Sequence, residues 1–279
     1  MKHCLQFTKQ LLLVITPLLA TTMLATLPSR AATSASSEGQ FKFSGFSQSS
    51  SRVLTNAESN TFTLGQGGSA IADAQAYAFF EKLPAQAFNF SSSVAFGENE
   101  GYLAEAESEA SIIGIFDIKA NSDFSFDFAG NLKLLTSIDN PSFENATASG
   151  DITFALLDIA NNNNILESFS LSGNLITKGD EDFIGYEKTE NVTLKNLTPV
   201  SSFDERKEFV TASVEGFVKR SFASQTNLAL IEIKKNKVTV KTPEPSTSLA
   251  FLLGSGVFGL VLKRKRQEKT VMDALGTSK

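Results

Sequence analysis

The side chains of this chain that could carry out chemistry are almost all carboxylates. Glu105, Glu107 and Glu109 alternate with small residues, so a strand would hold their three carboxylates on one face, about 7 Å apart. Two such groups could share a calcium ion. A second acidic run, Asp180 to Asp182, follows a glycine, and neither run has the spacing of a calcium-binding loop. We interpret both as solvated acidic faces and expect no cofactor and no metal, with calcium at the three glutamates as the alternative.

Nucleophilic catalysis has little material in this sequence. The single histidine, His3, and the single cysteine, Cys4, both lie within the first ten residues. The rest of the chain therefore cannot form a Ser-His-Asp triad, a Cys-His dyad, a disulfide or a zinc site of the usual type. A hydrolase that uses two carboxylates remains open, but some pair among so many acids will always fit. We predict that the protein is not an enzyme and has no catalytic residues.

Residues 1–32 have the pattern of a secretory signal peptide. Lys2 and Lys9 make the start basic, a short apolar core runs from residue 11 to residue 23, and small residues precede a cleavage site between Ala31 and Ala32. A retained membrane helix is the alternative, and the brevity of the apolar run argues against it. The sequence thus predicts export through the inner membrane.

The C-terminal region combines three elements in a fixed order. Pro243, Glu244 and Pro245 form a stiff, extended stretch, because each proline fixes φ and restricts the residue before it. An apolar segment at 249–262 follows, about 21 Å long as a helix and short of the roughly 30 Å hydrocarbon core. A basic cluster, Lys263-Arg264-Lys265-Arg266, would hold its far end in the cytoplasm together with a tail at 267–279.

This order of elements resembles the PEP-CTERM sorting signal of exported bacterial proteins, here over residues 242–266. The resemblance implies that an exosortase, a membrane transpeptidase, recognises Pro243, Glu244 and Pro245 and releases the tail. It also implies that the basic cluster at 263–266 is the membrane stop, and that the exported part passes to the envelope or the extracellular matrix. The tail beyond Arg266 is longer than is usual in that family, which leaves a permanently anchored protein as an alternative.

The segment between the two ends, residues 33–241, is predicted to be one exported domain. Residues 33–242 carry 16 Lys and Arg against 27 Asp and Glu, a net charge of −11. A body so acidic, with no basic patch, is not expected to bind nucleic acid. It would also repel anionic polysaccharide unless a divalent cation bridged the two.

Hydrophobic alternation predicts an all-β fold, an antiparallel β-sandwich with jelly-roll-like or Ig-like topology left open. The segments 123–138, 152–171 and 228–240 each suggest a hairpin, with turns at 129–131, 161–164 and 235–236. Two alanine-rich stretches, 70–79 and 104–110, have conflicting signals, because alanine favours helix while the period favours strand. We expect strands, whose alanines would let a neighbouring layer approach closely. The 24 phenylalanines are expected to fill the core.

These observations predict a non-enzymatic structural or adhesion-type protein of the envelope or extracellular matrix, processed by an exosortase and held, at least briefly, by its C-terminal membrane helix. Exopolysaccharide or matrix is the expected partner. Two alternatives remain, a β-sandwich permanently anchored in the membrane and a module that binds or cleaves polysaccharide. The sequence names no ligand for either.

Overall fold

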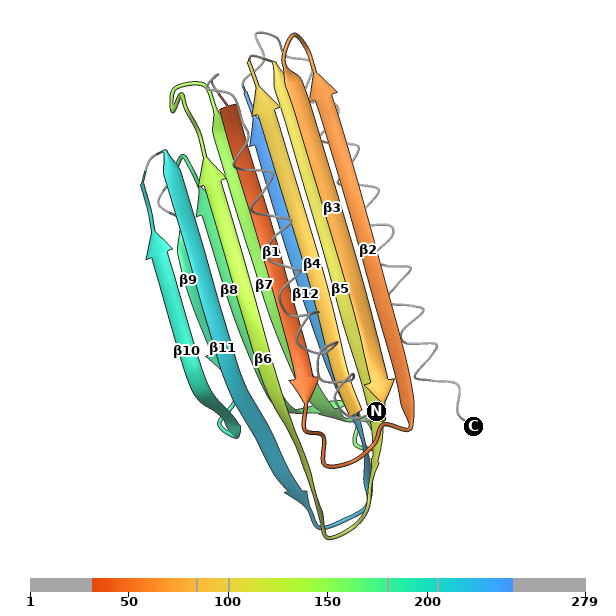
Figure 1. Ribbon diagram of the computed structural model, residues 1–279. Helices are drawn as coiled ribbons and strands as arrows, with labels where there is room; N and C mark the ends of the chain where they lie inside the picture. The colour runs from red at the N-terminus through yellow and green to blue at the C-terminus, as the bar shows by residue number, and fades with distance from the viewer. Residues whose placement is uncertain (1–31, 84, 100, 180, 205, 243–279) are drawn as a thin grey trace, which may run out of the picture.

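The computed structural model describes residues 32–242 with the exception of residues 84, 100, 180 and 205 (Figure 1). The predicted signal peptide, the Pro-Glu-Pro motif, the apolar segment and the basic cluster therefore lie outside the described residues. Within residues 32–242 the elements are all strands. Accordingly, this part of the chain holds no helix that could cross a bilayer.

Most of the twelve strands are long, and short loops connect them. In chain order they are β1 (Ala32–Ser44), β2 (Arg52–Gly65), β3 (Ser69–Lys82), β4 (Ala85–Glu98), β5 (Tyr102–Ile118), β6 (Ser122–Ser137), β7 (Asn145–Asp158), β8 (Asn164–Ile176), β9 (Phe183–Lys188), β10 (Val192–Ser202), β11 (Lys207–Phe222) and β12 (Thr226–Lys241).

The strands form two antiparallel sheets of six that pack face to face (Figure 1). The first sheet has the order β10-β11-β6-β1-β4-β3, and the second has the order β2-β5-β12-β7-β8-β9. This arrangement confirms the predicted antiparallel sandwich. The first strand and the last strand occupy inner positions in opposite sheets and contact each other across the interface.

Phenylalanine fills the half of the interior that lies farthest from the chain ends. Rings from both sheets pack together at centroid distances of 4.7–6.5 Å, in stacked and edge-to-face geometries. Phe154 of β7 lies in the middle of this group, which also includes Phe41, Phe43, Phe116, Phe124, Phe126, Phe128 and Phe169. The cluster holds the two sheets together without any disulfide, since the described body contains no cysteine.

The hairpin predicted at 123–138 is wrong. Residues 122–137 form one continuous strand, β6, which pairs with β1 on one side and β11 on the other. Gly130 marks a close approach instead of a turn, because a Cβ atom there would lie 2.5 Å from the ring of Phe41. The alternation of buried residues passes through Gly130 in phase, so Phe128 and Leu132 both face the core.

The hairpin predicted at 228–240 is also wrong, and its correction matters more. Residues 226–241 form the single strand β12, and the supposed turn at Lys235 and Asn236 lies in its middle. Ile233 faces outward and is 37% exposed. The inward positions are occupied by Glu232, Lys234 and Asn236, all of them buried.

Other predictions from the alternation are confirmed. β7 and β8 form the expected hairpin, with Asn162 and Asn163 in the left-handed region at φ values of 52° and 55°. The alanine-rich stretches are strands, β3 and β5, and they pack against each other across the two sheets. Ala104, Ala106 and Ala110 of β5 have no exposed surface, as expected for layers in close contact.

Candidate functional site

The two chain ends of the domain lie at the same end of the sandwich. β1 begins opposite the end of β4, where Ala32 pairs with Glu98, and β12 ends opposite the start of β5, where Lys241 pairs with Leu103. The loop from β4 to β5 connects these positions. The described body therefore begins and ends at one end of the sandwich, beside the two segments that are predicted to be processed.

Tyr102 joins the two ends. Its hydroxyl group donates a hydrogen bond of 2.6 Å to Oγ1 of Thr33, near the start of β1. Its backbone carbonyl accepts a hydrogen bond of 3.1 Å from the backbone N–H of Thr242. The Thr242 hydroxyl oxygen accepts from the backbone N–H groups of Gly101 and Tyr102, at 2.8 and 3.1 Å. Thr242 is buried, so the fold continues up to the residue before Pro243.

Tyr102 is buried, with 3% of its surface exposed. Burial raises the pKa of its phenol to about 12, the hydrogen bond to Thr33 opposes that rise, and the nearby carboxylates of Glu144 and Asp139 add to it. The ring lies against Gly97, where a Cβ atom would come within 2.1–2.6 Å of ring carbons. Only glycine at this position leaves room for the ring, so the packing at this end of the sandwich is tight.

The N-terminal junction has its own contact. The backbone nitrogen of Ala32 donates a hydrogen bond of 2.8 Å to Oδ2 of Asp139. If the chain is cut between Ala31 and Ala32, as the sequence predicts, this nitrogen becomes the α-ammonium group of the mature protein. The contact would then be a charge-assisted hydrogen bond, which is stronger than a neutral one. Pro243, Glu244, Pro245 and the cluster at 263–266 lie outside the described residues.

The three glutamates singled out in the sequence lie on the outer face of β5, as their spacing predicts. Lysines of the neighbouring strand β12 neutralise two of them: Lys237 contacts Glu107 at 2.5 Å, and Lys235 contacts Glu109 at 3.2 Å. Glu105 pairs in register with Thr239. These contacts favour a solvated, salt-bridged surface over a calcium site at Glu105, Glu107 and Glu109.

The second acidic run has a structural role where it is described. Oδ1 of Asp182 accepts a hydrogen bond of 2.7 Å from the backbone N–H of Ile176, which caps the end of β8. Among the described residues, no group of three or more Asp, Glu, His or Cys side chains could hold a metal ion.

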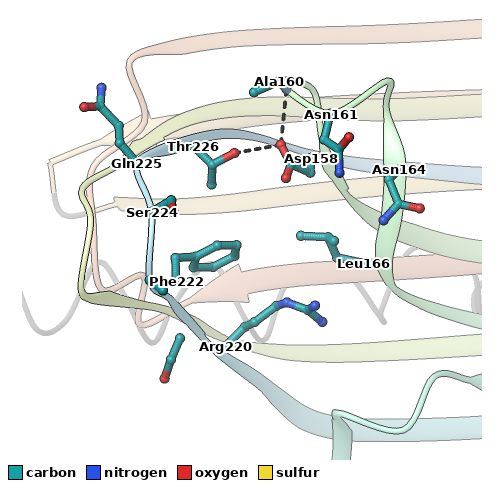
Figure 2. A pocket seen from close by; sticks show the side chains of 12 residues that line it. Asp158, Ala160, Asn161, Asn164, Leu166, Arg220, Phe222, Ser224, Gln225 and Thr226 are labelled. Atoms are coloured by element: carbon teal, nitrogen blue, oxygen red, sulfur yellow. Dashed lines mark hydrogen bonds between the residues drawn. The ribbon is translucent and has the colours of Figure 1, made fainter.

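An open pocket of about 510 Å³ lies at the opposite end of the sandwich from the termini (Figure 2). Its two charged side chains already have partners. Oδ1 of Asp158 accepts from the Thr226 hydroxyl at 2.7 Å and from the Ala160 N–H at 3.2 Å. Arg220 donates to the buried Glu167 at 2.6 Å. Side-chain amides of Asn161, Asn164 and Gln225 and the ring of Phe222 make up much of the remaining lining.

An aromatic face covers the outside of β3 and β4, and it includes four phenylalanines that were expected in the core. Cross-strand pairs bring its apolar side chains together, and Ile71 and Tyr77 are 61% and 55% exposed. The rings of Tyr77 and Phe79 lie 5.8 Å apart, and those of Phe79 and Phe88 5.9 Å apart. We call this the outer aromatic face; its residues are Ile71, Tyr77, Phe79, Phe88, Phe90 and Phe96. The pairs Asp73–Val94 and Gln75–Ser92 separate Ile71 and Phe96 from the other four.

A band of buried polar side chains crosses the middle of the interior, and sequence reasoning missed it. On one side, Asn236 donates to the Ser91 hydroxyl at 2.6 Å and accepts from the Ser37 hydroxyl at 2.7 Å. On the other side lie Lys234, Asn89 and Glu232, which we call the buried triad. Nζ of Lys234 donates to Oδ1 of Asn89 at 2.7 Å, and Nδ2 of Asn89 donates to Oε2 of Glu232.

The signal for this band was present in the sequence. From Leu228 to Val240 every even-numbered residue faces inward. The apolar residues at 228 and 230 and at 238 and 240 share this alternation, and the polar residues at 232, 234 and 236 lie between them in the same phase. A continuous strand would have placed Glu232, Lys234 and Asn236 in the core. The usual exclusion of charged residues from cores favoured a turn instead.

Comparison with known proteins bears on the C-terminal region alone. A family model described as the PEP-CTERM protein-sorting motif matches residues 241–266. This match confirms the resemblance drawn from Pro243, Glu244, Pro245 and the basic cluster. Neither the curated proteins nor the solved structures contain a match to this chain.

Proposed function

We propose that this chain, a PEP-CTERM sorting domain-containing protein, supplies the envelope or extracellular matrix with a non-enzymatic, adhesion-type β-sandwich. The motif makes it an exported protein that an exosortase sorts. The observation that carries the adhesive role is the outer aromatic face on β3 and β4. Contiguous exposed apolar groups mark interaction sites, and two neighbouring cross-strand pairs, Tyr77–Phe90 and Phe79–Phe88, form such a group on this face.

The position of the outer aromatic face supports this role. β3 is the edge strand of its sheet, and the exposed side chains of Ile71 and Tyr77 project from it. Tyr77 presents an apolar ring with a polar hydroxyl group, a combination suited to contact with a partner that is partly hydrated. A neutral polysaccharide or a matrix protein fits this surface better than an anionic polymer, given the acidic body.

The adhesive role predicts loss of retention when the face is made polar. In the double variant Ile71→Ser with Tyr77→Ser, we expect the ratio of matrix-bound to free protein to fall about tenfold. A loss of about 1.4 kcal/mol of binding free energy weakens the binding constant by that factor. The measurement is the ratio of matrix-bound to free protein by immunoblot. Leu54→Ser with Phe62→Ser is the matched control, because these exposed residues lie on β2 of the other sheet. Equal retention of both variants would refute the role.

The sorting step predicts a different result. Deleting Pro243 to Pro245 should leave full-length protein in the membrane fraction, because the extended substrate segment is lost while the apolar segment and the basic stop remain. Intact mass of the surface protein is the measurement. Loss of roughly 35 C-terminal residues from the wild type and not from the deletion supports processing. Retention of residues 267–279 in the wild type would support the permanently anchored alternative.

A further inference from the structure

The buried triad places an amine next to a carboxamide in the centre of the domain. Nζ of Lys234 lies 2.7 Å from Oδ1 of Asn89, so the nitrogen is close to the Cγ atom that carries this oxygen. Glu232 accepts a hydrogen bond from Nδ2, the nitrogen bonded to the same carbon. The three side chains thus surround one carbonyl carbon with a nucleophile, a leaving group and a group able to transfer a proton.

The interior enforces this arrangement. Lys234 reaches from β12 across to the opposite sheet, and Gly39 of β1 makes the space, because a Cβ atom there would lie 2.7 Å from Cδ of Lys234. Lys234, Asn89 and Glu232 have no exposed surface. Phe41 is the register partner of Asn89, and Phe154 is the register partner of Glu232. This enclosure excludes water from the carbonyl group.

Burial also favours the neutral forms of Lys234 and Glu232. It lowers the pKa of Lys234 to about 7, an effect that the carboxylates of Glu232 and Glu38 oppose. It raises the pKa of Glu232 to about 8, an effect that Lys234 and the hydrogen bond from Asn89 oppose. Near neutral pH the pair therefore has ready access to a neutral amine, which is the nucleophilic form, and a neutral carboxyl group. Within the described residues, Oε1 of Glu232 has no hydrogen-bond partner and so is free to carry the proton.

We propose that Lys234 and Asn89 join in an intramolecular amide cross-link, with Glu232 as the catalytic proton-transfer group. The lone pair of Nζ attacks Cγ of Asn89, and the carbonyl electrons move onto Oδ1. Neutral Glu232 first delivers its proton to Nδ2, which it already contacts. It then accepts one proton from Nζ, which the new bond to Cγ has placed next to Nδ2. The Cγ–Nδ2 bond then breaks, ammonia leaves, and the carbonyl re-forms as a secondary amide. Nothing is oxidised or reduced, and Glu232 ends in the state in which it began.

The cross-link would connect the two sheets. Asn89 lies on β4 of the first sheet and Lys234 on β12 of the second, so the bond closes a loop over more than half of the described body. β12 is also the strand that leads directly to Thr242 and the sorting motif. A covalent bond at its centre would hold it against tension applied at the C-terminus, in a domain that has no cysteine for a disulfide.

Peptide mapping of the full chain purified from the producing cell tests the proposal. Trypsin does not cleave after an acylated lysine, so residues 83–119 should be found joined to residues 221–235. The joined mass should be lower than that of the two peptides by one ammonia, about 17 Da. Succinimide formation at an asparagine loses the same mass, but it leaves the peptides separate. Recovery of separate peptides, with cleavage after Lys234, would overturn the proposal.

Variants assign the roles. Lys234→Met removes the nucleophile and Glu232→Gln removes the proton carrier, so we expect the joined peptide to vanish in the first and to fall at least tenfold in the second. Lys237→Met is the matched control, because it changes an outward lysine of the same strand and leaves both tryptic peptides intact. A Glu232→Gln chain that cross-links as fully as the wild type would refute the role of Glu232. The wild-type map remains decisive even if a variant fails to fold. Processing at either terminus does not alter these peptides.

Discussion

Replacing Phe154 with alanine is expected to lower the free energy of unfolding by about 3–5 kcal/mol. The side chain has no exposed surface, and its ring contacts rings from both sheets, among them Phe128 at 5.1 Å and Phe43 at 5.7 Å. Truncation would leave a cavity walled by rigid aromatic rings that cannot collapse into it. Denaturant titration followed by circular dichroism gives the measurement, with the midpoint and the slope fitted separately.

Phe62→Ala is the control for this loss. Phe62 lies on the edge strand β2 and is 42% exposed, so its truncation creates no closed cavity. We expect Phe62→Ala to change the free energy of unfolding by no more than the error of the titration. If Phe154→Ala lowered the free energy of unfolding no more than Phe62→Ala, the phenylalanine cluster would not be what holds the sheets together.

The variant Arg220→Met is expected to lower the free energy of unfolding by about 3 kcal/mol, because it leaves the buried carboxylate of Glu167 without a positively charged partner. Glu167 has no exposed surface, and Nη1 of Arg220 is bonded to its Oε1 at 2.6 Å across the two sheets. Thr189 and Asn191 each donate a further hydrogen bond of 2.8 Å to Glu167. These donors satisfy the oxygens but do not neutralise the charge. Thermal and denaturant unfolding both measure the loss.

Lys219→Met provides the matched comparison on the same strand. Lys219 pairs with Asp123 at 2.8 Å, but both side chains are about half exposed, and solvent screens such pairs strongly. Its removal should change stability far less than removal of Arg220. The double variant Arg220→Met with Glu167→Gln should regain much of the loss, because no charge is then left buried. Failure of that rescue would mean that Arg220 contributes by packing.

The sandwich was predictable because hydrophobic alternation is a local signal that a two-layer fold must obey. In the two alanine-rich stretches the two-residue alternation predicted strands, although the helix propensity of alanine favoured helices. Both stretches are strands. The two failed hairpins have a common cause. Gly130 and Lys235-Asn236 are residues typical of turns, and so a turn was predicted at each. The alternation of buried and exposed residues nevertheless continues in the same phase on both sides of each position. Pairing partners of the strands depend on long-range packing, so the strand order could not be derived from the sequence.

The sites divide in the same way. The sorting motif is a linear pattern and could be identified from Pro243, Glu244, Pro245 and the basic cluster. The buried triad and the Tyr102 junction depend on residues far apart in the chain, such as Asn89 with Lys234, and no spacing brings them together before the fold is known. The outer aromatic face was missed because alternation alone does not say which face of a strand is covered. On β4 both faces carry apolar residues.

The place of β12 sets the order of events at the membrane. Of the strands in residues 32–242, β12 is the last to be synthesised, yet it is the element that connects β5 to β7. Until residue 241 has emerged, the second layer exists only as β2 with β5 and as β7 with β8 and β9, and the phenylalanine cluster lacks one wall. The domain therefore cannot close before translocation has delivered the residues that adjoin the sorting motif.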